Sequence, residues 1–108
     1  MRRIALVVIM LTTLLFPAST FAENIPENVL ARIKKNVSDQ WPGQYSLQKT
    51  LVDAHVKSWL KLQRNYGDIP DSVFFEIRDR KAREWPDQYS LQETLVDADV
   101  KAWKELNQ

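Results

Sequence analysis

The chain has no cysteine, two glycines and a single histidine among its 108 residues. Without cysteine there is no disulfide to support a small domain, and no thiol for lipid attachment. One histidine without cysteine also leaves a structural zinc site with no ligand set. We therefore expect a fold held by apolar packing, with no cofactor and no metal.

The chain also has no large excess of basic or of acidic residues. The whole chain carries 15 basic and 14 acidic residues, and without Arg2 and Arg3 the balance becomes 13 to 14. Nucleic-acid binding needs a concentrated basic face. The composition therefore argues against a nucleic-acid partner.

Long hydrophobic runs are confined to the N-terminus, where 13 uncharged residues span 4–16, between Arg2-Arg3 and the small-residue segment "PASTFA". A membrane span needs about 20 apolar residues, whereas a short basic end, a short apolar run and small residues are typical of a secretory signal peptide. We predict a signal peptide over 1–22, cleavage near Ala22/Glu23, and a single periplasmic or secreted domain over 23–108. The alternative is an uncleaved N-terminal anchor.

The predicted domain consists of two copies of an internal sequence repeat. Residues 25–63 (the first copy) align with residues 69–107 (the second copy) at a shift of 44, with 20 of 39 positions identical, and residues 64–68 form a spacer. A single hairpin of this length buries too little apolar area to be stable alone. The second copy therefore supplies the other half of a core.

Each copy predicts two helices. The first is expected to start at the Ile-Pro pair, because a proline in the first turn of a helix loses no hydrogen bond. It should end near the tryptophan before Pro42 or Pro86, because the residue before a proline is disfavoured in the helical region. The second is expected to start at Ser46 or Ser90, the latter in a capping box with Glu93, and Gly67 suits a helix stop.

The apolar positions of each second helix form one stripe, and no segment alternates like a strand. We predict an all-α fold of two tandem helical hairpins, four helices in all, packed as a small pseudo-symmetric bundle. An open two-unit array is the alternative.

Comparing the copies weakens the case for catalysis. His55 is the obvious acid–base candidate, but its counterpart is Asp99, and a position that accepts both is expected on a solvated face.

Both copies have an aspartate four residues before a lysine: Asp53 before Lys57, and Asp97 before Lys101. This spacing on a helix favours exposed ion pairs. The competing hypothesis is a small hydrolase that uses these paired carboxylates.

Charge is the largest difference between the copies. The first copy has six bases and three acids, and the second has six bases and nine acids, so they carry +3 and −3. The split favours docking of one half on the other, or head-to-tail self-association between molecules.

The octets "WPGQYSLQ" and "WPDQYSLQ", which begin at Trp41 and Trp85, differ only at Gly43 and Asp87. One hypothesis is that the aromatic rings close the elbow between helices. The other is an exposed binding patch, since tryptophan and tyrosine are frequent anchors of interfaces and also stack on sugars. The candidate binding residues are Trp41, Gln44, Tyr45, Gln48, Trp85, Gln88, Tyr89 and Gln92.

The second octet, "WPDQYSLQ", resembles a Pro-Asp-Asp-Tyr-Ser-Met-Gln type of element found in uncharacterised exported bacterial proteins with tandem Trp-Pro-x-x-Tyr-Ser-x-Gln helical hairpins. Here Leu replaces Met and Gln replaces the second Asp. The resemblance covers eight residues in each copy and implies a bacterial helical module, without an activity. We predict a non-enzymatic binding or adaptor module of the cell envelope that engages a protein partner. The alternative is a glycan-binding module that recognises cell-wall or surface sugars.

Overall fold

The computed structural model describes residues 25–108, so the predicted signal peptide over 1–22 lies outside the described residues. Four helices follow in order: α3 (Glu27–Gln40), α4 (Tyr45–Lys61), α5 (Asp71–Glu84) and α6 (Tyr89–Leu106). The predicted all-α fold is confirmed. Within the described range, no helix is both long and apolar enough to cross a membrane.

The helix starts of α3 and α5 follow from the Ile-Pro pairs. Pro26 and Pro70 are extended, with ψ of 142° and 140°, and each carbonyl accepts two backbone N–H groups from the first turn of its helix. Glu27 and Asp71 come next, where an acid is favourable at the positive helix end. Both helices end before a tryptophan, as predicted, since the residue before a proline is disfavoured in the helical region.

The starts of α4 and α6 differ from the prediction. The helices begin at Tyr45 and Tyr89, and neither has a side-chain cap. Ser90 therefore lies inside the first turn, and Glu93 bonds Ser58 and Lys61 of α4 instead of closing a capping box.

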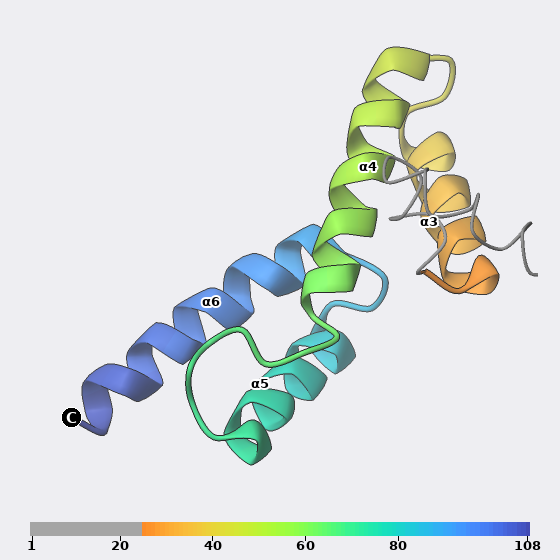
Figure 1. Cartoon of the computed structure of the whole chain (residues 1–108). Coiled ribbons are helices and arrows are strands. Elements are labelled where there is room, and N and C mark those ends of the chain that lie inside the picture. The colour runs from red at the N-terminus through yellow and green to blue at the C-terminus, as the bar shows by residue number, and fades with distance from the viewer. Residues whose placement is uncertain (1–24) are drawn as a thin grey trace, which may run out of the picture.

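The helices pair as two hairpins, α3 with α4 and α5 with α6, and the hairpins meet where α4 contacts α6 (Figure 1). The end of α4 lies near the start of α6. As a result, the elbow between α3 and α4 and the end of α6 lie at opposite ends of the molecule.

Each hairpin has its own apolar cluster, yet each cluster takes in a residue from the other copy. The buried members of the first cluster are Ile25, Val29, Ile33, Val37, Val56 and, from the second copy, Tyr89. Those of the second are Ile69, Phe74, Val96, Val100 and, from the first copy, Leu62.

The spacer is folded back on the second cluster. The Asn65 amide donates to Asp71 at 2.8 Å, and its oxygen accepts from the Gly67 N–H at 3.0 Å. Gly67 is not the predicted helix stop, because α4 ends at Lys61. Instead Gly67 lies against Val100, where a Cβ atom would approach Cγ1 to 2.8 Å. A glycine is required at position 67 because the backbone there lies too close to the Val100 side chain for a Cβ atom to fit.

Candidate functional site

The elbow tryptophans are half-exposed in both copies. Trp41 and Trp85 are 40% and 41% exposed, and Gln44 and Gln88 beside them are exposed. These four candidate residues therefore lie at the surface, equally in the two copies.

The other two candidate glutamines hold the elbows together. Gln48 Nε2 donates to the Trp41 carbonyl at 2.8 Å, and Gln92 Nε2 donates to the Trp85 carbonyl at 2.7 Å. Each bond links the first turn of the second helix to the end of the first helix across seven residues. The amide thus shares this helix-end carbonyl, which has no intrahelical partner, with the backbone N–H of Gln44 or Gln88 at 3.3 Å.

The two elbow tyrosines have opposite environments. Tyr45 is 77% exposed, whereas Tyr89 is 8% exposed. The letters around them are nearly identical, so the difference arises from the rest of the molecule. Tyr89 packs on the first hairpin, and no described segment packs on Tyr45 in the same way.

Tyr89 is the centre of the junction between the copies. Its ring meets the His55 ring edge-on, with centroids 6.5 Å apart, and its hydroxyl donates to Asp87 Oδ1 at 3.2 Å. Burial raises the pKa of the Tyr89 phenol above its ordinary value, although a hydrogen bond with Arg32 acts in the opposite direction. The phenol is thus a neutral donor.

The prediction that His55 lies on a solvated face is wrong. His55 is partly buried against Tyr89, and its Nδ1 atom has no hydrogen-bond partner within residues 25–108. Burial lowers the pKa of His55 below its ordinary value. The counterpart Asp99 instead pairs with Lys81 at 3.3 Å.

Asp87 explains the one difference between the octets. Gly43 and Asp87 both have left-handed backbone, with φ of 78° and 63°, which glycine adopts freely and aspartate tolerates at a cost. Asp87 offsets that cost by accepting from Tyr89 and pairing with Arg32 Nε at 3.3 Å across the junction. Gly43 has no such role.

An ion pair secures the other side of the junction. Lys61 Nζ and Ser58 Oγ both donate to the Glu93 carboxylate, each at 2.7 Å. Burial alone raises the pKa of Glu93, but the bonds from Lys61 and Ser58 outweigh it and leave that pKa below its ordinary value. Glu93 is therefore charged at neutral pH, and it ties α6 to the end of α4.

The last turn of α4 fills a groove between α5 and α6. Leu62 is 2% exposed, and its carbonyl accepts from Arg78 Nη1 at 3.3 Å. A residual cavity of about 200 Å³ remains there, bounded on one side by Trp59, Leu62 and Gln63, and on the other by Arg78, Asp79, Ala82, Tyr89 and Gln92.

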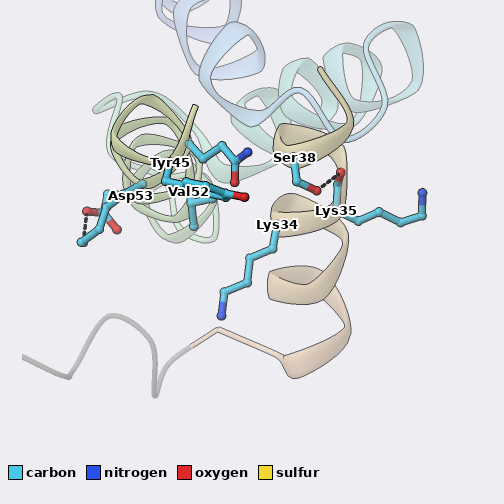
Figure 2. A pocket seen from close by; sticks show the side chains of 8 residues that line it. Lys34, Lys35, Ser38, Tyr45, Val52 and Asp53 are labelled. Carbon is cyan, nitrogen blue, oxygen red and sulfur yellow. Dashed lines mark hydrogen bonds and ion pairs between the residues drawn. The ribbon is translucent and has the colours of Figure 1, made fainter. Parts of the chain in front are cut away.

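The first hairpin carries the same groove without an occupant among the described residues. We name it the α3–α4 groove: a cavity of about 670 Å³ lined by Lys34, Lys35, Ser38, Tyr45, Gln48, Lys49, Val52 and Asp53. Figure 2 shows Lys34 on α3, and Tyr45 and Val52 on α4, on its two sides.

Five of these lining positions correspond, at the shift of 44, to residues that line the groove filled by α4. Lys34, Lys35, Ser38, Tyr45 and Gln48 match Arg78, Asp79, Ala82, Tyr89 and Gln92. The α3–α4 groove is therefore the first-copy equivalent of the surface at the junction. Sequence reasoning singled out Tyr45 and Gln48 but missed Lys34, Lys49 and Val52, whose signal lies only in the alignment of the copies.

The paired carboxylates do not form the predicted ion pairs. Asp53 pairs with Lys49 at 2.8 Å rather than with Lys57, and Asp97 accepts from the Tyr66 hydroxyl at 2.6 Å rather than pairing with Lys101. Each acid thus has its own partner in its own surroundings. Residues 25–108 contain no group of three or more His, Asp or Glu side chains arranged to hold a metal ion.

No protein-family model matches the chain, and comparisons with curated proteins and with solved structures found no match either.

Proposed function

We propose that this protein is a non-enzymatic binding module of the bacterial cell envelope, and that it engages a protein partner through the α3–α4 groove. The signal-like segment at residues 1–22 supports the location. The observation that carries the proposal is the junction itself, because the matching groove in the second copy already binds the end of a helix.

The lining of the groove suits a helix end. Tyr45 offers an exposed aromatic ring and Val52 an apolar floor. Lys34, and Lys49 with the N–H groups that it does not give to Asp53, offer donors for carbonyl or carboxylate groups. Aromatic side chains within a polar rim are typical of protein interfaces. A helix end also presents free carbonyls and a negative dipole, which match the two lysines.

Site-specific photo-crosslinking in the native envelope tests this function. We expect a crosslinker at position 45 to trap a discrete protein product, and the same group at the exposed Arg83 of α5 to give none. Lys49→Glu should weaken the product at position 45. Equal products from both positions, or no effect of Lys49→Glu, would refute the groove as the binding site.

Glycan binding is the second candidate, favoured by the half-exposed Trp41 and Trp85. A sugar that stacks on these rings should change tryptophan fluorescence when cell-wall fragments are added. Trp41→Phe with Trp85→Phe should abolish the change. A flat titration of the unmodified protein rejects this candidate.

A further inference from the structure

The molecule has a second unfilled surface that matches the α3–α4 groove. At the end of α6, Leu106 is 83% exposed, although its first-copy counterpart Leu62 is 2% exposed. The counterpart of the buried Ser58 is the exposed Ala102. The end of α6 thus repeats the apolar part of the α4 end. It lies at the opposite end of the molecule from the elbow between α3 and α4 (Figure 1), beside which Tyr45 and Gln48 line the groove.

One ion pair of the junction has counterparts at the two free surfaces, and there the two charges are exchanged. At the junction, Lys61 on the α4 end pairs with Glu93 on α6. Shifted by 44, Lys61 corresponds to Glu105, and Glu93, shifted back, corresponds to Lys49. Both members have changed sign, so the end of α6 and the groove would form the same pair with its polarity reversed.

Other junction contacts are partly retained. Arg78, which donates to the Leu62 carbonyl, corresponds to Lys34, whose ammonium group would be a donor for the Leu106 carbonyl in an equivalent contact. His55 and Tyr89 correspond to Asp99 and Tyr45, a carboxylate and a phenol that form a hydrogen bond readily.

Other contacts are lost, because Arg32 and Asp87 correspond to Glu76 and Gly43. Association between molecules also loses translational freedom, which the linked copies within one chain do not. The contact should therefore be weaker than the internal junction.

We propose that the partner in the α3–α4 groove is a second copy of this chain: the end of α6 of one molecule docks in the groove of the next, with Leu106 beside Val52 and Glu105 paired with Lys49. This inference rests on the proposed function of the groove. The contact is head to tail, so an assembly of any length keeps one free groove at one end and one free α6 end at the other, and copies add in a line unless the rotation closes a ring.

Charge reversal tests the pairing. We expect the purified protein to self-associate in sedimentation velocity at concentrations up to about 1 mM. Lys49→Glu alone and Glu105→Lys alone should each weaken association at least about fivefold, since each puts like charges together. An equimolar mixture of the two variants should restore it, because every contact between unlike variants then joins opposite charges. The native Lys49 of one variant meets the native Glu105 of the other, and the introduced carboxylate at position 49 meets the introduced ammonium group at position 105.

Two controls separate the outcomes. Circular dichroism and thermal melting should show that both variants keep their helices, since both positions are exposed. Arg83→Glu, an exposed site on α5 whose counterpart Asp39 lines neither the groove nor the junction cavity, should leave self-association unchanged.

A protein that stays monomeric at about 1 mM, or a mixture that fails to recover, overturns self-association. If crosslinking at position 45 then still traps a different protein, and Lys49→Glu still weakens that product, the groove keeps its proposed function with another partner. Loss of both results overturns the two proposals together.

Discussion

The phenol ring of Tyr89 stands edge-on to the imidazole ring of His55, with an interplanar angle of 79°. The contact joins the first turn of α6 to the middle of α4, and it places a second-copy aromatic ring in the first cluster. Tyr45, at the same position of the first copy, has no such neighbour among the described residues. The two tyrosines therefore provide an internal comparison of buried and free states.

Tyr89→Ala should destabilise the protein by about 3 kcal/mol, because it removes a buried ring and leaves a cavity. Tyr45→Ala should change stability by less than about 0.5 kcal/mol, since the ring is exposed. Urea unfolding, followed by circular dichroism at low protein concentration, measures both. Equal losses would show that Tyr45 is also part of the folded core.

Gly67→Ala should destabilise the protein by about 1–3 kcal/mol, because the new methyl group would overlap Val100. In a double-mutant cycle with Val100→Ala, the combined loss should be smaller than the sum of the single losses. Simple additivity would mean that the two side chains do not meet.

Asp87→Gly should leave the protein about 1 kcal/mol more stable than Asp87→Ala, because only glycine removes the left-handed strain while both lose the contacts to Arg32 and Tyr89. Gly43→Ala should cost about 1 kcal/mol for the same backbone reason. Thermal melting of the three variants checks the order. If Asp87→Ala is as stable as Asp87→Gly, the φ angle at 87 is not a source of strain.

Acid should destabilise the fold at mildly low pH. The pKa of His55 is lowered by burial in the folded state, so its contribution is complete above the unfolded value of about 6.5 and is lost as pH falls through the folded pKa. The melting temperature should therefore fall as the pH drops through the window below about 6.5. His55 is the sole histidine, so His55→Gln should flatten the curve in this window. A variant with an unchanged slope would assign the effect to other groups.

A second step should follow at lower pH. The pKa of Glu93 is held below its ordinary value by Lys61 and Ser58, so its contribution is present above the unfolded value and is lost as pH falls through the folded pKa. Glu93→Gln should remove this second step and leave the first.

Much of the fold could be predicted from local chemistry. Pro26, Pro70, Pro42 and Pro86 determine where α3 and α5 begin and end, and the effect of a proline on its neighbours is local. The apolar stripes likewise predicted most of the buried positions, with Leu106 at the end of α6 as an exception at 83% exposed.

The differences between the copies could not be predicted in this way. Tyr45 and Tyr89 stand in nearly the same octet, but within residues 25–108 the first hairpin packs on Tyr89 and no hairpin packs on Tyr45. Gln48 and Gln92 were candidates for ligand contact, but their amides serve the backbone at the elbow. That role depends on the path of the chain around Trp41 and Trp85, which spacing alone does not show.

The exchange of Tyr89 and Leu62 between the clusters has a consequence for how the molecule opens. If α5 and α6 unfold, the first cluster loses the Tyr89 ring, and if the end of α4 frays, the second loses Leu62. Neither hairpin can thus open without weakening the other, although each has most of its own core. Hydrogen exchange should therefore find the slowest amides of α3 and of α6 exchanging with similar free energies, as parts of a single cooperative unit.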